Sequence, residues 1–167
     1  MALTSAHARD LGADDKAGLV QAIKSFDAAM RAQDFDTVID QSITPKMMEF
    51  FADQAATPVE QLRPAIIGQL TAAMSAIELT GFSMDTDAIV YDQTSDGTQY
   101  ALIDTVTNMI AGAQNITATS QTLGFREGDS WYLVRVSDKE QADMFKAVYP
   151  SFASVNFPAG KMEMSDK

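Results

Sequence analysis

The spacing of hydrophobic residues changes once along this chain, near Leu79. Before this point apolar side chains recur every three or four residues, which is typical of helices that bury one face. After it, apolar and polar residues alternate, and β-branched and aromatic residues become frequent. Helices followed by a run of strands predict an α+β domain, with N-terminal helices packed on a curved antiparallel sheet of four or five strands.

Four helical segments are predicted before Leu79. Asp14–Asp15 are expected to cap the first, and Thr44 and Thr57, each followed by Pro, are expected to cap the third and fourth. Pro64 falls within the first two turns of the last segment, so regular helix there is expected to begin near this residue. The segments begin at Asp14–Asp15, at Thr37, at Thr44–Pro45 and at Thr57–Pro58, and the last one runs to about Ile77.

Four strands are predicted after Leu79, and the turns between them carry glycine, as hairpins require. The expected strands are residues 79–91, as one long or bulged strand, 99–109, 114–126 and 130–136. Residues 138–148 return to a helical pattern that Pro150 ends. The chain is therefore expected to form one domain over residues 14–149, followed by an irregular tail over residues 150–167.

Composition excludes several classes of function. The 167 residues include 23 acidic and 12 basic side chains, and the net charge of −11 argues against nucleic acid or an anionic membrane surface as the main partner. There is no cysteine, which excludes disulfides, thiolate zinc sites and a cysteine nucleophile. The single histidine, His7, excludes multi-histidine metal sites and places a Ser-His-Asp triad out of reach. No metal and no cofactor are predicted.

The N-terminal residues leave the compartment open. No apolar run approaches the roughly 20 residues of a membrane-spanning helix, so no membrane partner is predicted. Residues 1–13 are expected to be either a disordered tail or the remnant of a signal peptide, because Ala6-His7-Ala8 has the small-x-small form of a cleavage site. The protein is accordingly cytoplasmic in the first case and periplasmic or secreted in the second.

Two stretches of the chain resemble the nuclear transport factor 2-like superfamily, which includes ketosteroid isomerase-like and polyketide cyclase-like proteins. They are the helix and Asp turn from Phe26 to Asp36 and the final strands with Gly-x-x-Trp from Gly128 to Val134. The resemblance extends from about Asp14 to Ser137. It implies a cystatin-like cone with a small-molecule pocket in its mouth and a homodimer formed through the outer face of the sheet. The long helix from Thr57 to Ile77 departs from the family and is expected to narrow or close the cone.

The resemblance also implies a chemistry, in which a carboxylate base lies in an apolar pocket beside a hydroxyl donor. Asp104 is the candidate base, because it is the only charged residue from Ala101 to Thr107 and shares a face with Leu102 and Val106. Both faces of this strand carry apolar and polar residues. The alternative is therefore that Asp104 faces solvent or a dimer partner while Ile103 faces the core.

Other side chains are candidates for ligand binding, each with an ordinary structural alternative. Tyrosines on the strands can donate a hydroxyl or simply pack their rings. Arg135 can pair with an anionic ligand or with Asp104, or it can form a salt bridge at the rim. Flexible methionines can line a pocket or fill the core. The remaining candidates are Tyr91, Tyr100, Tyr132, Met47 and Met74.

One charge feature bears on partners. Between Arg63 and Arg126 there is no basic residue, whereas six acidic residues lie there, a pattern that either attracts a basic partner or only aids solubility. The leading prediction is a non-catalytic binding or interaction module that holds a small apolar ligand or a protein partner. The alternative is a cofactor-independent isomerase, dehydratase or cyclase with Asp104 as its base. A third possibility is an acidic inhibitor or immunity-type protein that blocks a basic partner.

Overall fold

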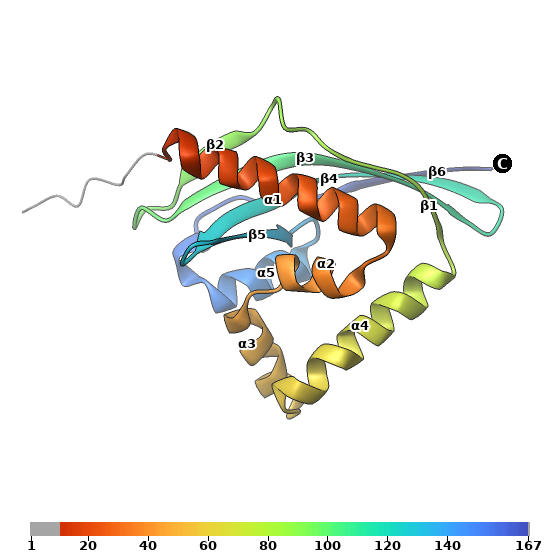
Figure 1. Cartoon of the computed structure of the whole chain (residues 1–167), viewed down its shortest axis with the longest axis horizontal. Coiled ribbons are helices and arrows are strands. Elements are labelled where there is room, and N and C mark those ends of the chain that lie inside the picture. The colour runs from red at the N-terminus through yellow and green to blue at the C-terminus, as the bar shows by residue number, and fades with distance from the viewer. Residues whose placement is uncertain (1–10, 167) are drawn as a thin grey trace, which may run out of the picture.

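The structure is a computed structural model and describes residues 11–166 (Figure 1). Helices pack on a curled antiparallel sheet that forms a half-barrel, which confirms the predicted α+β class. The expected tail or signal remnant at residues 1–13 lies almost entirely outside the described residues. The helices are α1 (Ala13–Ala32), α2 (Phe35–Ser42), α3 (Pro45–Ala55), α4 (Val59–Ser75), α5 (Lys139–Val148) and the short 3-10 helix η1 (Pro150–Phe152). The strands are β1 (Glu78–Met84), β2 (Val90–Gln93), β3 (Gln99–Ala111), β4 (Gln114–Glu127), β5 (Ser130–Arg135) and β6 (Lys161–Asp166).

Local signals at the helix starts are partly confirmed. Thr44 caps α3 as predicted, since its Oγ1 accepts a hydrogen bond of 3.1 Å from the backbone N–H of Met47. The predicted cap of α1 is wrong, because Gly12 is the cap and its N–H donates to the Asp15 carboxylate at 3.2 Å. The predicted cap of α4 is also wrong, because the helix starts after Pro58, which has no side chain able to cap it.

The predicted strand over residues 79–91 is two strands. Both β1 and β2 pair with β3, but with different parts of it: Met84 lies opposite Thr105, and Val90 lies opposite Leu102. The chain leaves the sheet between them and returns to the same edge. The 13-residue β3 is long enough to hold both, so a long-range pairing and not local sequence decides the break.

The prediction of an irregular C-terminal tail is wrong in two places. Residues 150–152 form η1, and residues 161–166 form β6, which pairs antiparallel with the first half of β4. Because β5 covers only the second half of β4, the first half would otherwise have a free edge. The alternation of Met162 and Met164 with charged neighbours is the period-2 signal of this strand.

The sheet is buried on both faces at one end. On one face, here called the α1 face, Leu19 and Ile23 of α1 pack against Ile103 and Leu133. On the other, the α5 face, an aromatic cluster forms the core. It contains Tyr100, Phe125, Phe145 and Phe152. The opposite end of the sheet, which includes β6, extends beyond these helices (Figure 1). Within residues 11–166, no helix is both long and apolar enough to cross a membrane.

Candidate functional site

Asp104 does not have the environment expected of a catalytic base. Its side chain is exposed on the α5 face, where Gln121 Nε2 donates a hydrogen bond of 2.9 Å to its carboxylate. The neighbouring Ile103 is fully buried on the α1 face, so the alternative register is confirmed. A base that shifts protons next to carbon needs a desolvated carboxylate, and an exposed one in contact with water lacks that property.

Two of the candidate tyrosines belong to the packed cluster on the α5 face. Tyr100 is buried with its ring 5.4 Å from that of Phe152, and Tyr132 is half-buried with its ring 6.1 Å from that of Phe125. Burial is the main cause that raises the pKa of both phenols, with nearby carboxylates adding to it. Their rings therefore pack in and beside the core, which is the structural alternative that was given for these tyrosines.

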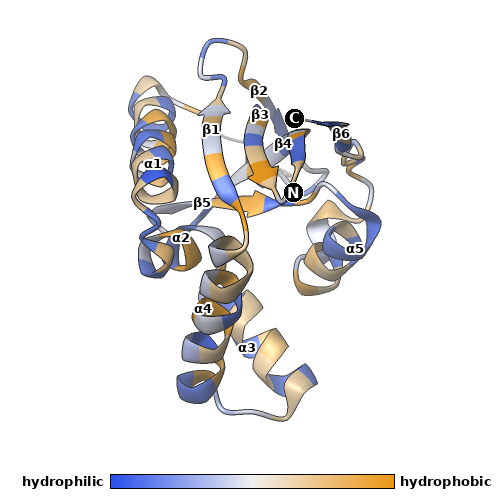
Figure 2. Cartoon of the chain, turned by 90° about the vertical axis from the view of Figure 1, so that its right-hand side faces the viewer, coloured by the Kyte–Doolittle hydropathy of each residue, from blue (hydrophilic) through white to orange (hydrophobic). Residues whose placement is uncertain are grey.

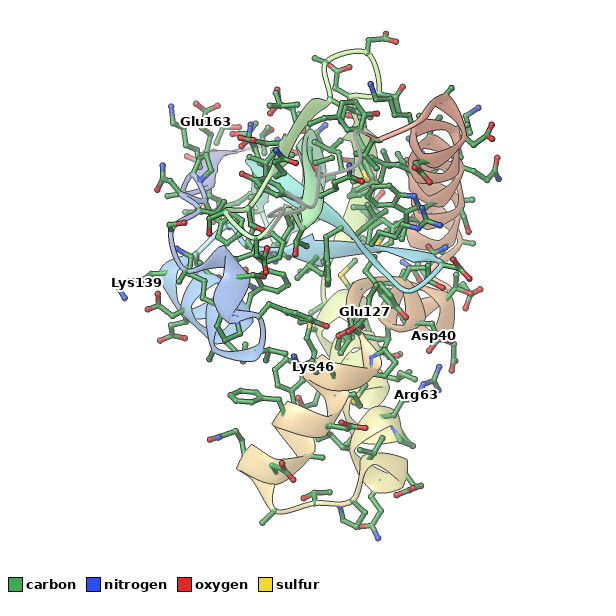
Figure 3. The ribbon with its side chains drawn as sticks, turned by 90° about the vertical axis from the view of Figure 1, so that its left-hand side faces the viewer. Asp40, Lys46, Arg63, Glu127, Lys139 and Glu163 are labelled. Carbon is green, nitrogen blue, oxygen red and sulfur yellow. The ribbon has the colours of Figure 1, made fainter. Side chains whose placement is uncertain are left out.

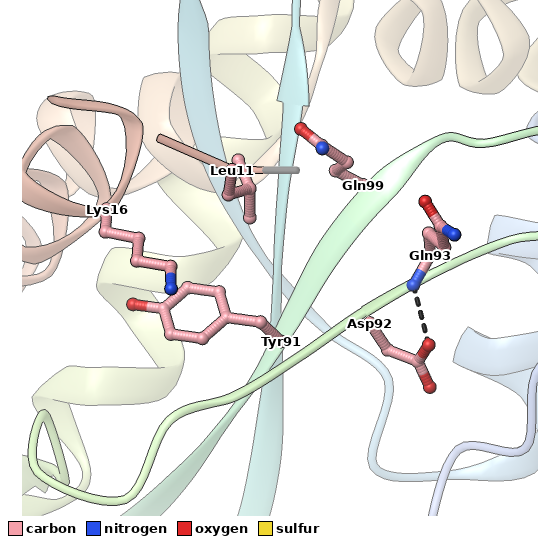
Figure 4. A pocket seen from close by; sticks show the side chains of 6 residues that line it. All are labelled: Leu11, Lys16, Tyr91, Asp92, Gln93 and Gln99. Carbon is pink, nitrogen blue, oxygen red and sulfur yellow. Dashed lines mark hydrogen bonds between the residues drawn. The ribbon is translucent and has the colours of Figure 1, made fainter. Parts of the chain in front are cut away.

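The third tyrosine, Tyr91, lines an open pocket beside the start of α1 (Figure 4). The ammonium group of Lys16 lies 4.8 Å from the centre of its ring. The pocket has a volume of about 510 Å³, and most of its lining side chains are polar. They are Lys16, Tyr91, Asp92, Gln93 and Gln99, with Leu11 as the apolar one. A lining of this kind does not suit an apolar ligand.

The remaining candidates do not come together either. Arg135 is exposed, lies on the α1 face opposite Thr122, and donates from Nε to Ser137 Oγ at 2.9 Å. Asp104 lies on the α5 face, so the alternative in which Arg135 pairs with Asp104 is wrong. Met47 is buried in the aromatic cluster and fills the core, whereas Met74 is half-buried on α4.

A polar network that sequence reasoning missed joins three distant elements. The Thr44 hydroxyl at the start of α3 lies 2.5 Å from the Tyr149 hydroxyl after α5, which in turn donates to the Glu127 carboxylate at 3.2 Å. Burial raises the pKa of Tyr149 to about 12. The Lys46 ammonium lies 5.0 Å from the centre of the Tyr149 ring, and both Lys46 and Glu127 are labelled in Figure 3. No local sequence motif predicts this network, because Thr44, Glu127 and Tyr149 are far apart in sequence.

Replacing Tyr149 by Phe tests this network. We expect a loss of about 1–2 kcal/mol of unfolding free energy at neutral pH, because the fully buried Thr44 hydroxyl loses its hydrogen bond to Tyr149 and keeps only the one from the Met47 N–H. The native state also resists ionisation of this phenol, whose ordinary pKa is about 10. The raised pKa of Tyr149 therefore adds to the free energy of unfolding. This stabilisation is fully present below pH 10 and is lost as pH rises through about 12. Urea unfolding across this range should therefore show a steeper fall for the wild type than for Tyr149→Phe, and equal slopes would contradict the assignment.

The most unusual surface is an apolar row across the free end of the sheet. Leu79 of β1 lies opposite Met109 of β3, Met109 opposite Ile116 of β4, and Ile116 opposite Met164 of β6. Directly opposed residues share a face, so these four side chains, the apolar row, cross four strands on the α1 face. Leu79, Met109 and Ile116 are half-buried, whereas Met164 is 60% exposed. Met162, two residues before Met164 on the same face, is 57% exposed.

The helices that the structure describes do not pack over this row. Helix α1 packs on β1 and β5, where Phe26 contacts Phe82, and α2 packs on β5. Helix α4 packs against α2 and α3, and the α3–α4 hairpin extends away from the sheet (Figure 2). Arg63 anchors α4 to α2 through Asp36 at 3.0 Å and Asp40 at 2.7 Å.

Helix α4 is itself unusual for an exposed helix. None of its residues is buried, and the chain from Pro64 to Ile77 contains no charged side chain. The helix ends just before β1, so its last turn comes close in sequence to Leu79 and the apolar row. An exposed helix that carries no charge from Pro64 to its end, in a protein of net charge −11, is typical of a surface that meets a partner.

The charged residues between Arg63 and Arg126 all have one sign. All six acidic residues between Arg63 and Arg126 are exposed. They are Glu78, Asp85, Asp87, Asp92, Asp96 and Asp104. Within the part of the chain that the structure describes, no three His, Cys, Asp or Glu side chains gather so as to hold a metal ion.

In comparisons with known proteins, no family model, curated protein or solved structure matches the chain. Membership of the nuclear transport factor 2-like superfamily therefore stays a hypothesis, while the helix-and-curled-sheet architecture that it implied is observed.

Proposed function

We propose that the protein is a non-catalytic interaction module that binds an apolar segment of a protein partner across the apolar row. The observation that carries this proposal is the register of Leu79, Met109, Ile116 and Met164 across four strands, with no helix of residues 11–166 packed over them. Exposed apolar surface that is continuous in this way marks interaction sites in soluble proteins.

A protein segment suits this surface better than a small molecule. Sites for small molecules enclose most of their ligand, whereas Met164 at the end of the row is 60% exposed. Strands lie about 4.8 Å apart, so a row across four of them spans about 14 Å. This length fits three turns of a helix or a short extended segment. A small apolar ligand would instead need an enclosed apolar cavity.

Charge indicates what flanks the apolar part of the partner. The exposed charged residues close to the row on its own strands are Glu78, Glu163 and Asp166, against the single basic residue Lys161. Basic residues on the partner would be steered toward this surface, and acidic ones would be repelled. The partner is therefore an apolar segment flanked by Lys or Arg, which also retains the basic partner of the third prediction.

The enzyme alternative has no comparable observation behind it. Its base, Asp104, is exposed, and the aromatic packing of Tyr100 and Tyr132 uses the rings that were expected to supply hydroxyl donors. The homodimer expected through the outer sheet face is not favoured by the exposed part of the α5 face, which carries polar Asp104, Gln121 and Thr117. Neither reading is proposed.

A neutral apolar dye tests whether the row is an apolar binding surface. Nile red is expected to gain fluorescence on binding the wild type. The double variant Met162→Lys/Met164→Lys is expected to bind it about tenfold more weakly, because one ammonium group then replaces the Met164 end of the row and a second lies beside it. Val90→Lys is the matched control, since Val90 is 54% exposed on a strand at the other edge of the sheet. An equal loss in the control, or no loss in the double variant, would contradict the proposal.

Paired peptides test the class of partner. A short leucine-rich peptide flanked by lysines is expected to bind at least tenfold more tightly at low salt than the same peptide flanked by glutamates, because the surface around the row is acidic. The difference should shrink as salt is added. Fluorescence anisotropy measures both peptides under the same conditions, and equal affinities would remove the basic partner from the proposal.

A further inference from the structure

Strand β6 presents an unpaired edge. It pairs with β4 along one side, and within residues 11–166 no strand pairs with its other side. All six of its residues are exposed. The free N–H and C=O groups of such an edge are a template for another strand.

The side chains of β6 alternate between the two faces of the sheet. Met162 and Met164 lie on the α1 face, opposite Ala118 and Ile116. Lys161 and Glu163 lie on the other face, and within residues 11–166 neither forms an ion pair. Figure 3 shows Glu163 at the outer margin of the molecule. The strand therefore offers an exposed apolar pair on one side and an unpaired cation and anion on the other.

We infer that β6 pairs antiparallel with β6 of a second copy of this chain, about a two-fold axis at Met162. In this register Met162 lies opposite the partner's Met162. Lys161 lies opposite the partner's Glu163, and Glu163 lies opposite the partner's Lys161. Opposite charges placed directly across an antiparallel pair stabilise it, and two such pairs form by symmetry.

Charge selects this register over its neighbour. Moving the axis by one residue, to Glu163, would place this carboxylate opposite the partner's Glu163 and would leave Lys161 opposite the partner's Ser165. Like charges directly across a strand pair are destabilising. Only the register centred on Met162 uses Lys161 and Glu163 together.

The pairing extends the fold without blocking the apolar row. With the axis perpendicular to the sheet, the α1 faces of both copies lie on the same side, and the strand order becomes β1-β3-β4-β6 followed by the same four strands reversed. Two apolar rows then line one continuous face. This inference does not rest on the proposed function, since its selecting charges lie on the opposite face.

The expected affinity is modest. The overlap of two short strands buries little area, and each copy carries a net charge of −11, which opposes association. We expect a dissociation constant in the micromolar range, on the order of 10–100 µM. Sedimentation velocity from about 1 µM to about 1 mM covers this range.

A charge swap tests the register. Glu163→Lys places Lys161 opposite a lysine of the partner at both pairs, and we expect the dimer dissociation constant to rise about tenfold. The double variant Lys161→Glu/Glu163→Lys restores opposite charges and is expected to restore the dimer. Asp53→Lys is the matched control, because it makes the same change of net charge at an exposed position on α3 and should leave the dimer nearly unchanged.

The outcomes separate clearly. Weakening by the single variant and recovery in the double variant support the inference. A wild type that stays monomeric throughout overturns it, as does a dimer that Glu163→Lys leaves intact or that the double variant fails to restore. Nile red binding should be the same in all these variants, so failure of the dimer and failure of the proposed function are told apart.

Discussion

Replacing Phe125 by Ala is expected to lower the free energy of unfolding by about 3–5 kcal/mol. Its side chain is 2% exposed on the α5 face. Its ring lies 5.3 Å from that of Phe145, 5.0 Å from Tyr149 and 6.0 Å from Phe152. Removing it leaves a cavity where β4, α5 and η1 meet, and the rigid rings around it cannot close that space.

Urea unfolding followed by circular dichroism measures this loss. Phe157→Ala is the matched control, because Phe157 is half-buried at the margin of the same cluster, with its ring 6.0 Å from Phe145. It should cost clearly less. A cost for Phe125→Ala below about 1 kcal/mol would mean that the aromatic cluster is not the main core of this end of the sheet.

The second large effect is expected on the α1 face, from Gly124→Val. A Cβ atom at this glycine would lie 3.0 Å from Leu19 Cδ1 and 3.3 Å from Ile103 Cδ1, both fully buried. Those neighbours have no free space, so the added valine must displace α1 from the sheet. We expect a cost of about 1–3 kcal/mol or more.

The matched control for this prediction is Gly68→Val on α4. Nothing lies within 4 Å of a Cβ atom built at Gly68, and valine has a slightly higher helix propensity than glycine. The variant should stay within about 0.5 kcal/mol of the wild type. If both valine variants proved equally harmless, the close packing of α1 on β4 would be refuted.

What was predictable in the fold depended on local signals. The change of hydrophobic period near Leu79 and the Thr44–Pro45 helix start act within a few residues, and both predictions are confirmed. The division of residues 79–91 into β1 and β2 depends on which part of β3 each one pairs with. Strand β6 likewise exists because β4 offers it an edge, so its short alternating sequence alone was not sufficient.

The face of Asp104 could not be decided from alternation for a physical reason. At one end the sheet is buried on both faces, so β3 carries apolar residues on the α1 face, such as Ile103, and on the α5 face, such as Tyr100. A strand of this kind has no purely polar side to identify. Only the packing of α1 settles which side holds Asp104.

The candidate site was hidden for a related reason. Leu79, Met109, Ile116 and Met164 come from four strands, and nothing in the sequence shows that they lie opposite one another. The methionines predicted as pocket candidates were Met47 and Met74, neither of which belongs to the row, and Met47 is in the core. The lack of basic residues between Arg63 and Arg126 was the one signal in the sequence that indicates the partner's charge.

Methionine methyl NMR offers the most direct test of binding across the apolar row. The protein is labelled with ¹³C at its methionine methyl groups and titrated with the lysine-flanked leucine peptide. We predict that the signals of Met109 and Met164 shift with the added peptide, while those of the buried Met47 and Met48 stay in place. Shifts confined to methionines outside the row, or no shift at saturating peptide, would contradict the account.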